Sequence, residues 1–261
     1  MIREGLPCKL VLLYHIRRMS RIIRAFSTDA HLQKVGENLV LGVEESQHLS
    51  RVLRLESGRR IQVLDGQGRI LSMQCDQISY RQVSGQIIEE QSVLPSQPRF
   101  QIAVALIKAG RWDGIIRPLT ELGVSRITPL HTERTDFPRN SVRWEPRLKK
   151  WNRSAIEACK QSGNPWLPQI DSPMTFEEYL SEELERDMFL ASLRPSSLTL
   201  NISASSTLIS LLIGPEGGWT DGEETLAIKR GVSLFSIGTN VLRAETAASS
   251  ALAVAKAKIL D

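Results

Sequence analysis

Two glycine-containing stretches near the C-terminus are the most informative part of the sequence: Leu211-Leu-Ile-Gly-Pro-Glu-Gly-Gly-Trp219 and Ser236-Ile-Gly-Thr-Asn-Val-Leu-Arg-Ala-Glu-Thr-Ala247. Each begins with a short apolar run typical of a buried strand and then opens into a loop that contains glycine. Glycine at a strand end lets the backbone approach a ligand closely, so that N–H and C=O groups recognise it directly. Two such loops so close together in the chain predict one composite pocket.

A helix-start signal follows the first loop. Thr220 and Glu223 have the spacing of a capping box, in which the Thr220 hydroxyl accepts from the Glu223 amide and the Glu223 carboxylate accepts from the Thr220 amide. This pattern predicts a strand–loop–helix unit and gives Glu223 a structural role, whereas Glu216 has no obvious structural role. The second loop leads into a segment rich in alanine, which has the highest helix propensity.

Two common nucleotide-binding loops are excluded by their missing residues. A phosphate-binding P-loop needs Lys followed by Ser or Thr after its last glycine, and no Lys follows Gly218. The dinucleotide fingerprint G-x-G-x-x-G is also absent, because Gly66-x-Gly68 lacks the third glycine and lies between strand-like runs. These absences disfavour a nucleoside triphosphatase and a Rossmann-type methyltransferase.

The composition is that of a globular protein, with 41% hydrophobic and 24% charged residues among 261. No apolar stretch approaches the ~20 residues of a membrane span, so we expect a cytoplasmic protein with no membrane partner. The net charge of +4 fits a nucleic-acid partner but is weak support alone. Cys8, Cys75 and Cys159 and the four histidines fall in no metal-ligand spacing, which predicts free buried thiols and no metal.

Composition and hydrophobic periodicity divide the chain into four segments. Residues 1–18 are basic and are either a transit peptide or RNA-binding arm, or a segment upstream of the true start at Met19, which we favour. Short alternating runs over residues 19–93 predict a small β-barrel. Two prolines mark residues 94–98 as a linker. In residues 99–261 strand-like runs alternate with helical ones, which predicts an α/β domain with a largely parallel sheet.

The patterns predict several individual elements. The expected strands are 39–43, 60–64, 70–75, 83–88, 100–107 and 127–130, and the expected helices are 45–54, 115–122 and 154–161. In the first helix Leu49, Val52 and Leu53 share a face, which leaves Arg51 and Arg54 outside. These two arginines fit an RNA contact and an ordinary solvated face about equally well.

Taken together, the two loops resemble the cofactor loops of the SPOUT methyltransferases, most closely the ribosomal RNA small subunit methyltransferase E family. Thr120–Pro129, Thr132–Arg134 and Glu157–Gln161 also have family counterparts, so the resemblance runs from about Met19 to the C-terminus. It implies a trefoil-knotted, parallel-sheet methyltransferase domain behind a PUA-like RNA-binding β-barrel, a homodimer, and S-adenosylmethionine held bent between three loops. The cofactor positions carried over by motif are Leu193, Gly214, Pro215, Glu216, Gly217, Gly218, Ile237, Gly238, Val241 and Leu242.

The resemblance further implies methylation of N3 of a specific uridine in 16S rRNA, in the assembled small subunit. Because uracil N3–H is a weak acid, the site must favour loss of its proton. Arg243 is expected to stabilise negative charge on a uracil oxygen, with Glu216 or Glu245 accepting the proton or orienting Arg243. Glu245 equally fits a charge that complements a helix start. Two alternatives stay open: a ribosome-assembly factor with a vestigial methyltransferase fold, and a SPOUT enzyme that methylates ribose.

Basic residues outside the loops are expected to bind RNA. They are Arg51, Arg54, Arg117, Arg134, Arg147 and Lys150. Trp144, Leu148 and Trp151 lie at helical spacing, so we expect these apolar side chains in the core and the basic face on RNA. The family prefers Lys, Ala and Arg where Arg117, Pro118 and Asn164 stand. Pro118 is expected to kink or shorten its helix, and Asn164 to remove one RNA or active-site contact.

Overall fold

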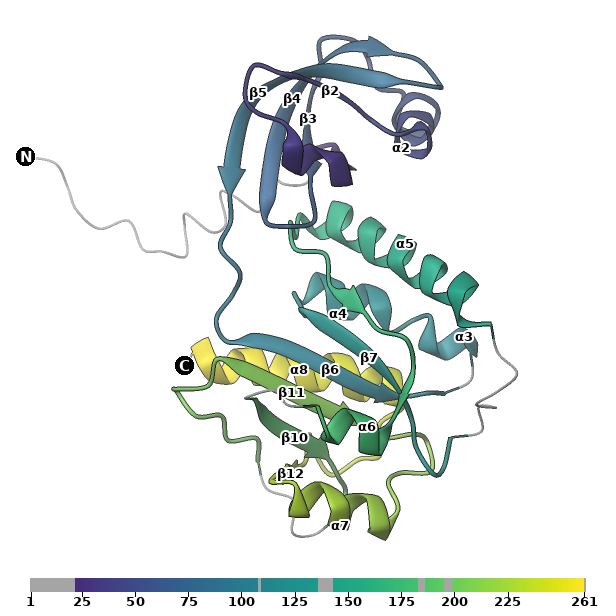
Figure 1. Cartoon of the computed structure of the whole chain (residues 1–261), viewed down its shortest axis with the longest axis vertical. Helices are drawn as coiled ribbons and strands as arrows, with labels where there is room; N and C mark the ends of the chain where they lie inside the picture. Colours follow the sequence, from purple (N-terminus) through teal and green to yellow (C-terminus); the bar gives the residue numbers. More distant parts are fainter. Residues whose placement is uncertain (1–21, 108, 136–142, 183–185, 195–198, 261) are drawn as a thin grey trace, which may run out of the picture. The chain divides into compact units, whose positions relative to one another are not determined.

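A computed structural model describes residues 22–107, 109–135, 143–182, 186–194 and 199–260 (Figure 1). The predicted extension of residues 1–18 and Cys8 lie outside this range. The chain forms two compact units that meet between Val93 and Leu94.

The first unit is built on a five-stranded sheet in the order β1-β3-β4-β5-β2. Its strands are β1 (Arg24–Phe26), β2 (Asn38–Val40), β3 (Arg60–Leu64), β4 (Arg69–Ile78) and β5 (Val83–Ser92), and a short 3₁₀ helix, η1, spans Thr28–Leu32. β1 and β3 are parallel and the other pairs are antiparallel. Inward side chains alternate along the strands, as Ile61, Val63, Leu71 and Met73 show. The four strands expected here are all present, and β4 and β5 are longer than predicted.

The helix expected over residues 45–54 is wrong in form. The chain makes a short α-helix, α2 (Val43–Gln47), followed by a π-helical turn, η2 (His48–Val52), in which the Leu53 amide donates to the His48 carbonyl. Because a π turn breaks the 3.6-residue period, the predicted apolar face is not shared: Leu49 is buried, whereas Val52 and Leu53 are 66% and 41% exposed. Arg54 ends the segment with a φ of 48°.

The second unit contains a seven-stranded sheet with the order β12-β10-β11-β6-β7-β8, in which β9 also pairs with β7. Its strands are β6 (Arg99–Ala105), β7 (Arg126–His131), β8 (Gln169–Ile170), β9 (Met174–Thr175), β10 (Asp187–Ala191), β11 (Leu208–Ile213) and β12 (Ser233–Phe235). All recorded pairs are parallel, as predicted. Every residue of β11 is buried, as expected of a parallel strand covered on both faces.

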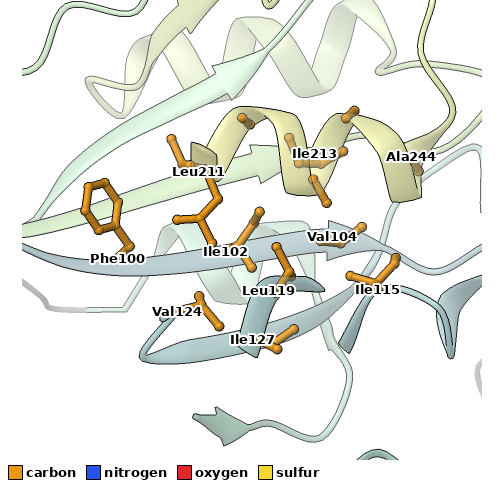
Figure 2. Packing of buried hydrophobic residues seen from close by; sticks show 14 of the residues in the cluster. Phe100, Ile102, Val104, Ile115, Leu119, Val124, Ile127, Leu211, Ile213 and Ala244 are labelled. Atoms are coloured by element: carbon orange, nitrogen blue, oxygen red, sulfur yellow. The ribbon is translucent and has the colours of Figure 1, made fainter. Parts of the chain in front are cut away.

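Helices cover both faces of this sheet. They are α3 (Ala109–Trp112), α4 (Ile116–Glu121), α5 (Trp144–Ser162), α6 (Phe176–Leu180), α7 (Asp221–Lys229) and α8 (Ala244–Leu260). Figure 2 shows one face, where Ile102 and Val104 of β6 and Leu211 and Ile213 of β11 pack with Leu119 and with Ala244 at the start of α8. Residues of α6 and α7 pack in a separate cluster with the alternate residues of the same strands.

The expected core position of Trp144, Leu148 and Trp151 is confirmed in this unit, whereas the kink or shortening expected at Pro118 stays a prediction. Pro118 lies in the first turn of the six-residue helix α4, where a missing N–H costs no helical hydrogen bond. Trp151 is buried, and Trp144 and Leu148 pack against the same core.

The two described cysteines are buried and free, as predicted. Burial, together with the charge of Asp76, raises the pKa of the Cys75 thiol to about 11, and burial raises that of Cys159 to about 12. Among the described residues no His, Cys, Asp and Glu cluster could hold a metal ion. Within the same part of the chain, no helix is both long and apolar enough to cross a membrane.

Candidate active site

A cavity of about 520 Å³ lies where β10, β11 and β12 end. These three strands are neighbours in the sheet, so their carboxyl ends bring three loops together, which is where parallel α/β sheets bind ligands. The cavity is lined by residues of these loops and by Ala244 and Ala247 of α8. All ten positions carried over by motif line it: Leu193, Gly214, Pro215, Glu216, Gly217, Gly218, Ile237, Gly238, Val241 and Leu242.

The first glycine loop is shaped by its glycines and by Trp219. Gly218 has a φ of 69°, which favours glycine, and its amide closes a turn onto the Pro215 carbonyl at 2.8 Å. A Cβ at Gly214 would lie 2.9 Å from Trp219 Nε1, so this glycine makes room for the indole. Trp219 Nε1 in turn donates to the Ala191 carbonyl at 3.0 Å, which fastens the loop after β11 to the end of β10.

A buried carboxylate fixes the third wall of the cavity. Glu224, in the first half of α7, accepts from Ser192 Oγ at 2.7 Å and forms an ion pair with Arg194. Arg194 also pairs with Asp221 at 2.5 Å. These contacts hold the loop after β10 against α7. The sequence reasoning missed Glu224 and Arg194, because their contact links segments that are distant in the chain.

The segment after β7 braces the glycine loop from outside. Arg134 Nη1 donates to the Gly217 carbonyl at 2.7 Å and to the Trp219 carbonyl at 3.2 Å. The predicted capping box of Thr220 and Glu223 is present, and Glu223 also accepts from the Glu133 amide at 2.9 Å. Arg134, expected on RNA, is therefore an anchor of the glycine loop in the folded chain.

Comparison with known proteins agrees with this geometry. A family profile described as an RNA methyltransferase domain matches residues 95–256. A ribosomal RNA small subunit methyltransferase E from Synechocystis is 35% identical over 237 residues, which cover 85% of this chain and 73% of the relative. The chain belongs to this RNA methyltransferase family.

Two solved structures have the same architecture. The ribosomal RNA small subunit methyltransferase E from Neisseria gonorrhoeae, bound to S-adenosyl methionine, is 26% identical with a TM-score of 0.83. A methyltransferase from Legionella pneumophila, in complex with the bound cofactor SAM, is 30% identical with a TM-score of 0.82. Each match covers 91% of this chain and 98% of the other. The fold is thus the α/β, SPOUT-type fold of the methyltransferase E family, preceded in the chain by a small β unit of the PUA-like kind.

The predicted catalytic residues of this family member are not all placed at the cavity. Glu216 lines it, and its carboxylate forms an ion pair with Arg111 of α3, a partner that sequence reasoning missed. Arg243 is exposed just before α8, and neither it nor Glu245 is among the described residues that line the cavity. Within the described chain, Oε2 of Glu245 is buried and has no hydrogen-bond partner. Sequence patterns indicate no obvious structural role for Glu216, and the structure gives its carboxylate this one ion pair.

The residues expected to bind RNA fall into two groups. Arg51, Arg54 and Arg117 are exposed. Lys150 forms an ion pair with Asp113, whose other oxygen accepts from Trp151 Nε1 at 2.7 Å, so Lys150 helps seat α5. The Arg147 guanidinium lies 5.7 Å from the Trp144 ring centroid.

Asn164, where the methyltransferase E family prefers arginine, has a structural role. Its Nδ2 donates to the Thr120 carbonyl at 3.0 Å and its Oδ1 accepts from the Trp166 amide at 3.0 Å. These bonds tie the turn after α5 to the end of α4. The loss of an RNA or active-site contact at this position stays a prediction.

Proposed function

We propose that this protein is an S-adenosylmethionine-dependent methyltransferase that modifies N3 of one uridine in 16S rRNA, within the assembled small ribosomal subunit. The observation that carries the proposal is the gathering of three separate loops, with all ten motif positions, around one cavity at the ends of β10, β11 and β12. Membership of the RNA methyltransferase family supports the reaction class. The substrate base rests on the resemblance.

The residues present fit S-adenosylmethionine. A Cβ at Gly238 would meet no atom within 4 Å, so the glycine leaves open space beside the cavity for a ligand. Leu193 and Val241 are 60% and 77% exposed, and such apolar side chains suit a flat base like adenine. The cavity is lined by three carboxylates, those of Glu216, Asp221 and Glu224, and by one guanidinium, that of Arg194. This excess of negative charge in the lining suits a cationic sulfonium. When bound, the cofactor supplies an activated methyl group.

The chain's own residues would act on the uracil. Arg243 is exposed just before α8, and its guanidinium would stabilise charge on a uracil oxygen. Of the two candidate proton acceptors, Glu245 is favoured over Glu216. Glu216 already has Arg111 as a partner, whereas Oε2 of Glu245 has none among the described residues, and a buried acceptor without a donor is costly.

The proposed partners are rRNA and a second copy of this chain. Exposed Arg51, Arg54 and Arg117 would contact rRNA phosphates, and a homodimer would form beside α8. The protein would act in the cytoplasm, where ribosomal subunits are assembled.

Three measurements test the proposal. Calorimetry should show binding of S-adenosylmethionine, and a protein that does not bind it is a vestigial assembly factor. Labelled methyl transfer to small subunits and to protein-free 16S rRNA should favour the subunits. Nucleoside mass spectrometry should find 3-methyluridine; a ribose-methylated nucleoside instead would assign the chain to the other SPOUT chemistry.

A further inference from the structure

A hairpin tip and a helical turn in the first unit form a basic surface with an aromatic centre. β4 and β5 are joined by the tight turn Ser79–Gln82, in which Tyr80 is 44% exposed. The Arg51 guanidinium lies 5.2 Å and the Arg81 guanidinium 5.1 Å from the centroid of the Tyr80 ring. We call Arg51, Tyr80 and Arg81 the Tyr80 surface.

The Tyr80 surface is held by rigid elements. The Ser79 amide donates to the Gln82 carbonyl at 2.8 Å, and Ser79 Oγ accepts from the Gln82 amide at 3.0 Å. Buried Ser46 of α2 accepts from the Val83 amide at 2.8 Å and donates to the Leu41 carbonyl at 3.2 Å. These bonds join the hairpin to the helical segment that carries Arg51, so the side chains are preorganised for a ligand.

Nothing in the fold requires an aromatic ring at this tip. Gly, Asn, Asp and Ser are the residues that favour a tight turn, and Tyr80 adds nothing to the buried core of the unit. Two like-charged guanidiniums at one ring also repel each other. In the part of the chain that the structure describes, Arg51, Arg54 and Arg81 form no salt bridge. An anion from another molecule would therefore balance their positive charge.

Single-stranded RNA supplies both an anion for the arginines and a flat ring for Tyr80 to stack on. Its phosphates pair with guanidiniums, and its unstacked bases stack on aromatic rings and on arginine planes. Val52 and Leu53, exposed beside Arg51, add apolar area that a purely phosphate-binding surface would not need. We infer that the Tyr80 surface binds a single-stranded segment of RNA, with an unpaired base against the arginine–tyrosine stack. This inference deepens the proposed function and rests on it for the identity of the RNA.

Binding of a uridine-containing single-stranded RNA oligonucleotide to the full-length protein tests the inference. Tyr80→Ala should weaken binding about tenfold, because stacking of one base is lost, whereas Tyr80→Phe keeps the ring and should bind like the wild type. Arg81→Gln should lower the slope of log K against log salt by about 0.7, the contribution of one phosphate on a single strand. Arg59→Gln, an equal charge change at another exposed arginine of this unit, should have a smaller effect.

The outcomes separate the inference from the proposed function. Affinity for S-adenosylmethionine should stay unchanged in every variant. Equal binding by Tyr80→Ala and wild type, or no RNA binding by the wild type, overturns the inference. Loss of binding to assembled subunits with unchanged binding to free RNA assigns the surface to a ribosomal protein and also overturns it. A wild type that binds RNA through Tyr80 but transfers no methyl group refutes only the enzyme proposal.

Discussion

The Arg111 guanidinium donates to the Glu216 carboxylate, and this ion pair joins α3 to the glycine loop across 105 positions of the chain. Both side chains remain substantially exposed, at 41% and 45%. An exposed pair contributes little to stability, so its effect is chiefly on the position of the carboxylate. Glu216 is therefore held toward α3 at the wall of the cavity.

Removing either partner should loosen this loop to a similar extent. We expect Arg111→Gln and Glu216→Gln each to weaken affinity for S-adenosylmethionine by about two- to fivefold, the scale of an exposed ion pair. The double variant should be no worse than the single ones, since residues in direct contact are coupled. Calorimetry on the four proteins measures this. A fall of kcat by about a hundredfold in Glu216→Gln alone would instead make Glu216 the proton acceptor.

Gly238→Val should abolish cofactor binding without unfolding the protein. A Cβ at Gly238 meets no protein atom within 4 Å, so the added side chain would occupy space left for the ligand. Gly217 is a less clean test, because its Cβ would lie 3.3 Å from Arg134 Cδ and disturb the loop. Gly42→Val in the first unit, where a Cβ also meets no atom, is the matched control.

Thermal melting and calorimetry together decide the outcome for Gly238. The expected result is a melting temperature close to that of the wild type with no detectable binding of S-adenosylmethionine. Near-native affinity in a folded Gly238→Val protein would remove this glycine from the cofactor site.

Local chemistry explains what the sequence could predict. The apolar run that begins at Leu211 and the capping box of Thr220 and Glu223 depend only on residues near one another. The run lies in strand β11, and the capping box is present as expected. The prediction of one helix over residues 45–54 was wrong, because a π turn changes the helical period there and leaves Val52 exposed. The trefoil knot is a matter of chain threading, which no spacing encodes, and stays an expectation from the resemblance.

Contacts between distant segments were outside the reach of the sequence. Arg134 was expected on RNA as a basic residue outside the glycine loops, yet its guanidinium donates to two carbonyls of the first glycine loop. Arg111 and Glu224 were overlooked because each forms an ion pair with a residue far away in the sequence, and only the folded structure brings the two partners together. Glycines in loops predicted the position of the cavity better than charged residues did. A glycine has no side chain, so a ligand can approach the backbone closely at that position.

Arg134→Gln should weaken cofactor binding, although Arg134 was first assigned to RNA. The charged donor bonds two carbonyls of the glycine loop, and such a bond contributes roughly 1.5–3 kcal/mol. We expect at least a tenfold loss of affinity for S-adenosylmethionine. Arg117→Gln, at an exposed arginine of α4, should leave that affinity unchanged and lower only RNA affinity. Equal cofactor affinities in both variants would return Arg134 to the RNA surface.

Glu182 should give the second unit an acid-sensitive contribution to stability. Burial alone would raise the pKa of Glu182, but hydrogen bonds from Arg126 and Arg186 outweigh it and hold the pKa below its ordinary value of 4.5. A lowered pKa stabilises the folded state above the unfolded pKa, and this contribution is lost as pH falls through the folded pKa. Glu182→Gln should therefore cost about 3 kcal/mol at neutral pH, because two guanidiniums lose a shared partner.

Urea unfolding at neutral pH and below pH 4 checks the sign. The difference between wild type and Glu182→Gln should shrink at the lower pH, where wild-type Glu182 also becomes protonated. Glu177→Gln, at an exposed glutamate of the preceding helix α6, should match the wild type at both pH values. A difference that grows on acidification would contradict the lowered pKa.

The family resemblance implies a homodimer, and we expect α8 to lie at the contact between the two chains. On α8, Leu252 is fully buried in its own chain's core, so it cannot contact a partner. Val254 remains 39% exposed on the same helix and is the better candidate. A two-fold pair would have a mass of about 58 kDa, twice the 29.2 kDa chain, and such pairs are the commonest oligomers.

Light scattering of charge-insertion variants tests this contact. Val254→Glu buries a charge if α8 lies at the interface, so the equilibrium should shift toward the monomer and methyl transfer should fall with it. Ile228→Glu places the same charge at a residue of α7 that is 50% exposed, and it should stay dimeric and active. Because Leu252 is already buried, Leu252→Glu would unfold the chain and cannot report on assembly. A fully active monomeric wild type, or a Val254→Glu protein that is still dimeric, would exclude α8 as the interface.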